Sequence, residues 1–371
     1  MSLPDARVDV IVPVHSANRP VGRAVRSALA SAVDGRVRVI VVCHGIGRIE
    51  IAEAIGDAAL DPRVELLEFV DGVSSPAGPV NAGLDAATAE FVFRLDSDDE
   101  LEAGAIDSML AMQQRDAADV VIPVIMNGRR GPLLSPRVRR GRRSRLAPVA
   151  DRLAYRTHAF ALIRRERFGR LRLQEGLATG EDLEFTTSLW FSSARISFDL
   201  GGPGYLMHDD AADRITAARR RVGDDLACVE RLLASESFAA CSGRPRRAIA
   251  VKLIRNHLLA TLRNRPRSGD WDEADREAAA STANAILETA PHAARSLSVA
   301  ERRMLQGLCD PTTDLAGLLA YANRPRRMHE LLLTGDLLGL LDADAPLRMT
   351  SAARSLTREV NASRARRGVA S

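Results

Sequence analysis

Residues 90–101, EFVFRLDSDDEL, place a short apolar run directly before a cluster of acidic side chains. The run at 91–93 is typical of a buried strand, whereas Asp96, Asp98 and Asp99 put three carboxylates within four positions. Carboxylates this close repel one another unless a cation neutralises them, and hard divalent ions prefer oxygen ligands. The stretch therefore predicts a strand that ends at a cation site, although a solvated turn rich in Asp and Ser has the same pattern.

The segments around this stretch alternate between two patterns. Short runs rich in Val, Ile and Phe are typical of strands and occur at 8–14, 36–42, 63–69 and 90–95. Segments with apolar residues at helical spacing lie between them, at 20–33, 49–60 and 78–89. This order predicts an α/β fold with a mostly parallel, Rossmann-like sheet and helices on both faces. In such sheets ligands bind beyond the carboxyl ends of the strands, where the acidic cluster falls.

The alternation stops in the middle of the chain. A further strand is predicted at 117–128, and the stretch 128–148 then carries eight arginines without an apolar period, which predicts an exposed loop. From about residue 216 onward the pattern is helical, with start signals at Asp270 with Glu273 and at Ser298 with Glu301. We therefore expect an α/β domain at 1–215 and an all-helical domain at 216–371.

Composition indicates the cellular compartment in which the protein is expected. The 371 residues carry a formal net charge of +4, and 46% of them are hydrophobic, which is ordinary for a globular protein. The four cysteines are scattered, so they indicate neither a zinc site nor a disulfide framework. The first residues lack the pattern of a signal peptide, and no apolar run reaches the length needed to span a bilayer. We expect a cytoplasmic protein, with peripheral contact at the inner face of the plasma membrane left open.

Two further stretches carry candidate chemistry. TGEDLEF (179–185) has the residue types of a helix N-terminus, where acidic side chains are favoured, and a carboxylate held there would also serve as a general base. His208 is either a surface or packed histidine or, beside a metal and a diphosphate, a ligand. Cys43 and His44 do not form a nucleophilic pair, because adjacent residues point to different sides of a strand.

The arginine-rich stretch allows several partners. Nucleic acid, an acidic lipid headgroup and a phosphorylated acceptor all fit its charge, and a solvated insert fits it equally. Stacking aromatics are missing from it, and aromatic residues make up only 4% of the chain. Since binding of single-stranded nucleic acid relies on such stacking, no nucleic-acid partner is expected.

The order of these motifs is more specific than any one of them. The chain runs through VDVIVPVH (8–15), RVIVVCHG (38–45), NAGLDAATAEFVFRLDSDDEL (81–101) and GEDLEF (180–185). Over roughly residues 7 to 215 this order resembles the family 2 glycosyltransferases, which have the GT-A fold. The resemblance implies an enzyme that transfers a sugar from a nucleotide-sugar donor and inverts the anomeric centre.

The resemblance also implies roles for individual residues. Asp182, with Glu181 beside it, would be the catalytic base that takes a proton from the acceptor hydroxyl. Asp98 would bind Mn²⁺ or Mg²⁺, with His208 as a second contact to the metal or the diphosphate. The donor would be bound by Pro13, His15, His44, Asn81, Arg94 and Asp96. A metal and positive groups stabilise the charge that gathers on a departing diphosphate.

This chain departs from the family pattern at two places. The family usually has an acidic pair where Cys43, His44 and Gly45 stand, and an arginine where Val80 stands. Arg94 partly replaces that missing cation, and His44 is expected to contact the base of the nucleotide. Because of these departures, the sequence does not determine the donor, although a UDP-sugar is favoured. The acceptor is expected to be a saccharide, a polyol phosphate or a lipid-linked precursor of the cell envelope.

Two rival functions remain after this comparison. A non-catalytic GT-A-like scaffold in envelope assembly would explain the lost acidic pair, and homo-oligomers through the helical domain are compatible with either function. A nucleotidyltransferase is disfavoured, because no glycine-rich phosphate loop follows the first strand.

Overall fold

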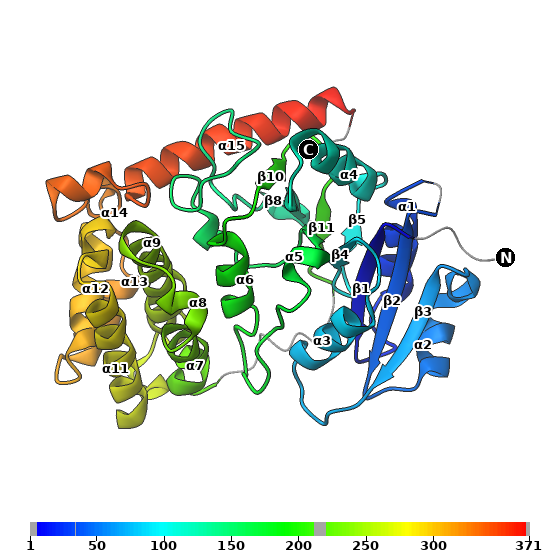
Figure 1. The fold of residues 1–371 in the computed structure, drawn as a ribbon. Coiled ribbons are helices and arrows are strands. Elements are labelled where there is room, and N and C mark those ends of the chain that lie inside the picture. Colours follow the sequence, from blue (N-terminus) through cyan, green and yellow to red (C-terminus); the bar gives the residue numbers. More distant parts are fainter. Residues whose placement is uncertain (1–5, 34, 211–219, 369–371) are drawn as a thin grey trace.

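The computed structural model describes residues 6–33, 35–210 and 220–368. Figure 1 shows an α/β part beside a group of helices, with one long helix reaching across both. The α/β part is built on a seven-stranded sheet. Its strands, in spatial order, are β10 (Ile196–Asp199), β6 (Val120–Pro123), β9 (Leu162–Arg164), β4 (Phe91–Arg94), β1 (Val8–Val14), β2 (Val37–His44) and β3 (Val64–Phe69).

The sheet is mostly parallel, as the sequence predicts. Strand β1 pairs in parallel with β2 and β4, and β6 pairs in parallel with β10, whereas β9 lies antiparallel between β4 and β6. The strand predicted at 117–128 is in fact two strands, because the peptide nitrogen of Pro123 cannot donate to a ladder and the chain leaves the sheet there. The second piece joins a four-stranded sheet made of β5 (Glu100–Leu101), β11 (Tyr205–Met207), β7 (Ile125–Asn127) and β8 (Gly131–Pro132).

Alternation along the strands assigns helices to the two faces of the large sheet. Val10 and Val12 of β1 face one core, and Ile11 between them faces another. The first core is closed by α1 (Val21–Ala30), α2 (Arg48–Ile55) and α4 (Ala105–Asp116). The opposite core is closed by α3 (Ala77–Ala86) and α6 (Leu183–Trp190), and the short α5 (Arg165–Phe168) follows β9. Helices on both faces confirm the predicted fold class.

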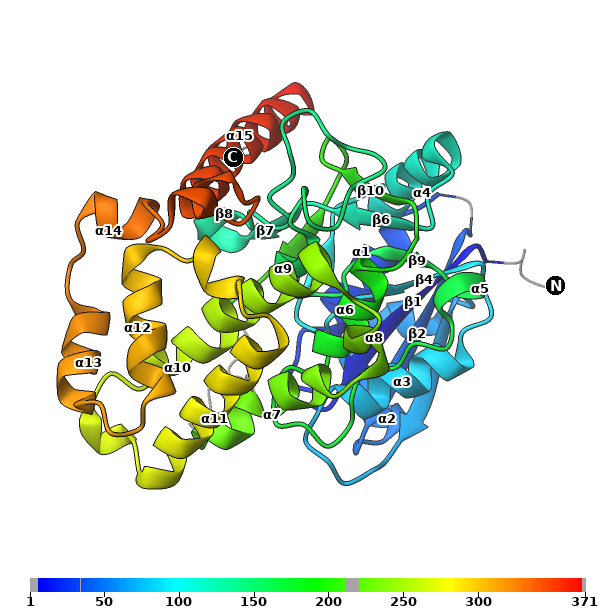
Figure 2. The ribbon, with the colours of Figure 1, turned by 60° about the vertical axis from the view of Figure 1, so that its left-hand side comes forward.

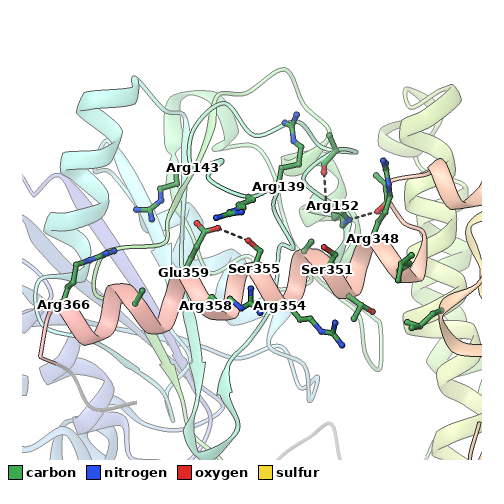
Figure 3. A pocket seen from close by; sticks show the side chains of 18 residues that line it. Arg139, Arg143, Arg152, Arg348, Ser351, Arg354, Ser355, Arg358, Glu359 and Arg366 are labelled. Atoms are coloured by element: carbon green, nitrogen blue, oxygen red, sulfur yellow. Dashed lines mark hydrogen bonds between the residues drawn. The ribbon is translucent and has the colours of Figure 1, made fainter. Parts of the chain in front are cut away.

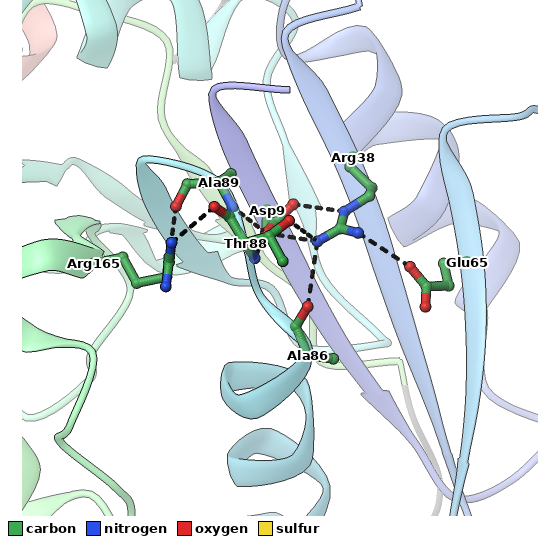
Figure 4. Close-up of polar contacts among 7 residues, drawn as sticks. All are labelled: Asp9, Arg38, Glu65, Ala86, Thr88, Ala89 and Arg165. Carbon is green, nitrogen blue, oxygen red and sulfur yellow. Dashed lines mark hydrogen bonds and ion pairs between the residues drawn. The ribbon is translucent and has the colours of Figure 1, made fainter. Parts of the chain in front are cut away.

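A buried carboxylate ties the first strands together. Asp9 of β1 is fully buried, and Arg38 of β2 donates to it through Nε and a terminal nitrogen at 2.8 and 2.9 Å. The backbone nitrogens of Thr88 and Ala89 also donate to Asp9, at 2.7 and 2.8 Å (Figure 4). Because all these bonds go to one charge, the loop before β4 is fixed against β1.

This network gives a first testable prediction. Asp9→Asn keeps the volume of the side chain but turns an amide NH₂ toward donors, so it should lower the free energy of unfolding by about 1.5–3 kcal/mol. Urea unfolding followed by the fluorescence of Trp190, which lies in the core of this part, measures the loss. Glu65→Gln is the matched control, since Glu65 contacts the same Arg38 but is exposed; it should cost about 0–1 kcal/mol. Equal losses in the two variants would contradict the assignment.

The second part of the chain is helical, as predicted. Its helices are α7 (Val222–Leu233), α8 (Glu236–Ala239), α9 (Gly243–Leu253), α10 (Leu259–Asn264), α11 (Glu273–Thr289), α12 (Val299–Cys309), α13 (Leu315–Asn323), α14 (Met328–Leu332) and α15 (Pro346–Arg366). Ser298 and Glu301 form the predicted capping box of α12. The signal at Asp270 with Glu273 is wrong by two positions, because Asp272 and Asp275 cap α11. In the described ranges no helix has both the length and the apolar character needed to cross a membrane.

The two parts share structure across the predicted boundary, which falls at residues 215–216 and so lies outside the described residues. Leu183 of α6 belongs to the core of the helical part. In the other direction, α15 returns to the α/β part, where Leu356 and Val360 join the core behind the sheet and Arg364 pairs with Glu102 at 2.9 Å. Figure 2 shows α15 passing from α14 toward α4.

The arginine-rich stretch is largely a loop with exposed arginines, as its sequence predicts, but apolar side chains on either side of those arginines are buried. Val138 and Leu146 are buried in the core behind the sheet. The fully buried Asp151 accepts two bonds from the Arg139 side chain, both at 2.8 Å, one from the Arg139 backbone nitrogen at 3.1 Å and one from the Ala147 nitrogen at 2.8 Å. A carboxylate outside the stretch therefore folds it back onto the protein.

Candidate active site

A cavity of about 630 Å³ opens beyond the carboxyl ends of β1, β2 and β4. Its size suits a small-molecule ligand. Nine of the ten site residues proposed from the sequence line it. They are Pro13, His15, His44, Arg94, Asp96, Asp98, Glu181, Asp182 and His208.

Asn81 is the exception, and its predicted contact with the donor is not what the structure shows. The side chain is buried in α3, outside the cavity lining. Its amide donates to the Leu173 carbonyl and to Glu175, both at 3.0 Å, and its oxygen accepts from the Leu173 nitrogen at 2.8 Å. With every polar atom engaged in this way, Asn81 fastens α3 to the segment that leads to Glu181.

His44 has an acidic partner that its own segment lacks. Its Nε2 lies 2.7 Å from Oδ1 of Asp71, and Asp71 also accepts from the Val73 nitrogen at 2.9 Å. Asp71 follows β3, and β3 pairs with β2, so the two strand ends meet at one edge. Sequence reasoning missed this residue, although its place at the end of a predicted strand was a usable signal.

The three carboxylates that follow β4 have three different partners. Asp96 pairs with Nε of Arg94 at 3.0 Å. Asp98 pairs with Arg19 at 3.1 Å, and its backbone carbonyl accepts from Arg23. Both arginines follow β1 and were not among the residues proposed from the sequence. The charge cluster is therefore partly neutralised by guanidinium groups.

Asp99 organises the cavity wall. The Tyr205 hydroxyl donates to it at 2.6 Å and the His208 nitrogen donates to it at 2.8 Å. Burial, together with the neighbouring Asp96, raises the pKa of Asp99 to about 7. Asp99 thus fastens β11 beside the acidic turn and fixes the backbone of His208, whose ring Nε2 lies 2.7 Å from Glu100.

The chemistry of this edge suits a hard divalent cation in company with a substrate. In the described part of the chain no three His, Cys, Asp or Glu side chains are arranged as a metal site. Mg²⁺, however, is usually held by one or two carboxylates together with substrate phosphates. Asp98 and His208 have the donor types for such a shared site.

Glu181 and Asp182 face the same cavity from the N-terminus of α6. The Asp182 carbonyl accepts from the backbone and hydroxyl of Thr186, each at 2.8 Å, which fixes the first turn. Burial and the adjacent Glu181 charge raise the pKa of Asp182 to about 7, while Arg94 and Lys252 act in the opposite direction. A carboxylate with such a pKa is a competent general base near neutral pH.

The helical part packs against the segment that carries Asp182. Gly180 has φ +75°, and a Cβ there would lie 2.6 Å from Sγ of Cys228 in α7. Both the backbone conformation and the contact require glycine. Behind this contact, the buried Lys252 of α9 donates to Nε2 of His257 at 2.9 Å.

A π turn at Ile254–Leu258, between α9 and α10, brings His257 to Lys252. Residues five apart do not share a face of an α-helix, but they do across a turn with i to i+5 bonding. Burial and Lys252 hold the pKa of His257 well below its usual value, so the ring is neutral. Burial lowers the pKa of Lys252 to about 8, which leaves it mostly charged near neutral pH. Lys252 is the only lysine of the chain, and sequence reasoning gave it no role in the site.

The comparisons with known proteins agree with this architecture. Residues 9–172 match the model of glycosyl transferase family 2. Crystal structures of S. aureus TarS 1–349 are similar: the complex with UDP-GlcNAc has a TM-score of 0.70 at 16% identity, covering 84% of this chain and 89% of that one, and the complex with UDP has a TM-score of 0.65 at 16% identity with the same coverage.

The longer S. aureus TarS structure has a TM-score of 0.66 at 16% identity, and the match covers 86% of this chain and 56% of that one. No curated protein matched. At 16% identity the similarity to TarS shows only the fold. The family assignment comes from the match of residues 9–172 to the family model. Residues 9–172 therefore form a glycosyl transferase family 2 domain with the GT-A fold.

Proposed function

We propose that this chain is an inverting glycosyltransferase that moves a sugar from a UDP-sugar donor to an acceptor hydroxyl in the synthesis of envelope polysaccharide or glycolipid. One observation carries the proposal: the Asp96–Asp98 edge and the Glu181–Asp182 edge face one cavity from different elements. In a single displacement the catalytic base and the leaving group lie on opposite sides of the sugar. The Glu181–Asp182 edge would supply the base, and the Asp96–Asp98 edge would hold the leaving diphosphate. The UDP-GlcNAc complex of TarS supports a nucleotide-sugar donor.

Asp182 is the proposed catalytic base. Its Oδ atoms would take the proton of the acceptor hydroxyl as that oxygen attacks the anomeric carbon. Glu181 keeps the pKa of Asp182 high enough for proton transfer, and the charges of Arg94 and Lys252 keep the carboxylate available in its ionised form.

The other edge is proposed to hold the donor. In this proposal His44, oriented by Asp71, would contact the nucleobase, and Asp96 would contact the ribose or the donor sugar. Arg19 and Arg94 bring positive charge toward the diphosphate. Mn²⁺ or Mg²⁺ would be held by Asp98 and His208, and when bound it would supply electrostatic stabilisation of the leaving diphosphate.

Titration calorimetry with UDP tests this proposal. The wild-type protein should bind UDP more tightly with Mn²⁺ or Mg²⁺ than with a chelator. Asp98→Asn should lose at least about tenfold in the metal-dependent affinity, because it removes a charged ligand. Asp57→Asn is the matched control, since Asp57 is exposed on the turn after α2 and should leave binding unchanged.

Two outcomes would contradict the proposal in different ways. If wild-type UDP affinity is the same with metal and with chelator, the assignment of Asp98 and His208 to a cation is wrong. If UDP does not bind under either condition, the domain is better explained as a GT-A-like scaffold, a function with which the Arg19–Asp98 ion pair is compatible.

A further inference from the structure

A second cavity, of about 1190 Å³, runs along α15 and shares no lining residue with the active site. Figure 3 shows Arg139, Arg143 and Arg152 on one side of α15, and Arg348, Arg354, Arg358 and Arg366 along the helix itself. Eight arginines line this groove, together with a single acidic residue, Glu359. They are Arg139, Arg140, Arg143, Arg152, Arg348, Arg354, Arg358 and Arg366.

The arginines of the groove fall into two groups. Arg139 is held by Asp151, and Arg152 is held by the carbonyls of Ala343 and Arg137, each at 2.7 Å. These two build the wall. In contrast, Arg354 and Arg358 are exposed one helical turn apart, and no ion pair to them occurs among the described residues. The groove therefore presents net positive charge to solvent, which attracts anions.

An apolar surface adjoins the groove. Of the thirteen large hydrophobic side chains that the described residues expose, seven fall within 328–347. They are Met328, Leu331, Leu333, Leu337, Leu338, Leu341 and Leu347. Leu332 and Leu347 line the groove itself, and α14 and the turn Leu337–Leu341 pack on α15. An apolar patch of this kind marks an interaction surface.

We propose that the groove and the adjoining leucines together dock the protein onto a membrane that contains anionic phospholipid. The leucines would enter the interface, and Arg354, Arg358 and their neighbours would bind the phosphate headgroups. Apolar insertion combined with basic side chains is what stable peripheral attachment requires. The inference does not depend on the proposed function.

The combination of the two features favours a membrane over other occupants. A soluble polyanion would account for the arginines but would leave the leucines in water. A second copy of this chain in a two-fold contact would cover the leucines, but it would bring the same arginine groove against itself. A lipid surface satisfies both features at once.

Sedimentation with vesicles tests the charged half of the surface. The protein should bind vesicles of phosphatidylcholine mixed with phosphatidylglycerol, and it should bind vesicles of phosphatidylcholine alone much more weakly. Each arginine near an anionic surface contributes about fivefold, so Arg354→Gln with Arg358→Gln should lower the partition coefficient by about 25-fold. Arg48→Gln with Arg195→Gln is the matched control; it removes the same charge from exposed positions elsewhere and should have little effect.

The apolar half has an equally close control. Leu337→Ser with Leu338→Ser removes side chains that are 83% and 61% exposed, and it should weaken binding at least about tenfold at any salt concentration. Leu60→Ser with Ile49→Ser removes side chains that are 85% and 74% exposed from the α/β part, and it should leave binding unchanged.

Three results would overturn the inference. The first is the absence of vesicle binding, or binding that ignores lipid charge. The second is binding of soluble polyphosphate that the arginine variant abolishes, in a protein that vesicles do not retain. The third is a dimer in light scattering that Leu337→Ser with Leu338→Ser dissociates. Because UDP binding is measured without vesicles, its outcome and this one are read separately.

Discussion

Asp182→Asn is expected to lower kcat by about 10²–10⁴-fold, because asparagine keeps the shape of the side chain but cannot accept the proton of the acceptor hydroxyl. The fold should survive, since the capping bonds of Asp182 to Thr186 come from its backbone carbonyl. UDP release measured with a nucleotide-sugar donor and an acceptor gives kcat. Calorimetry should show UDP affinity close to that of the wild-type protein.

The raised pKa of Asp182 predicts how the activity depends on pH. Asp182 acts only when ionised, and its pKa is raised to about 7, so wild-type activity should be low in acid and rise as the pH passes through neutrality. Glu181→Gln removes the adjacent negative charge and should move that rise to lower pH. Glu184→Gln, three residues after Glu181 and outside the cavity lining, is the control and should keep the wild-type profile. Full turnover by Asp182→Asn would remove the assignment.

Local sequence patterns predicted the parts of this structure that depend on neighbours along the chain. The run at 8–14 is β1 as predicted, and the acidic cluster stands at the end of β4. In a parallel sheet all strand ends of this kind meet at one edge, so the pattern alone placed Asp96, Asp98 and His44 in one cavity.

The residues that were missed act through contacts far apart in the sequence. Asp71 reaches His44 across a strand pair, and Asp151 folds the arginine-rich stretch that looked like a solvated loop. Asn81 has the residue type of a ligand contact, but the backbone of Leu173 and the side chain of Glu175 use all its bonds. In each case the sequence gives the residue type, but it does not show which residue that side chain contacts in the folded protein.

The three carboxylates of the acidic turn illustrate the same limit. Sequence reasoning assigned Asp96 and Asp98 and left Asp99 without a role. Asp99 fastens β11, an element that lies about a hundred positions away, and so it determines where His208 stands. The sequence alone does not distinguish a structural carboxylate such as Asp99 from one that contacts a ligand, because the position of β11 relative to the acidic turn is not known from the sequence.

Lys252→Met is expected to move the rise of kcat/KM with pH to higher pH by about 1–3 units, because it removes an opposite charge that favours ionised Asp182. At pH 7, where about half of Asp182 is ionised in the wild-type protein, the variant should therefore lose about 5- to 500-fold in activity. The remaining groups that act on Asp182 would be Glu181, which repels it, and Arg94, which still attracts it. Activity recovered in alkaline buffer would distinguish this electrostatic effect from misfolding.

Arg244→Gln provides the control, because Arg244 is an exposed cation on the same helix α9 and its loss should leave the profile unchanged. Lys252→Arg keeps the charge and should restore a profile near that of the wild-type protein. A folded Lys252→Met variant with the wild-type pH profile would contradict the link. If the shift is found, the helical part does more than pack beside the sheet: its buried lysine sets the pH at which the proposed base can work.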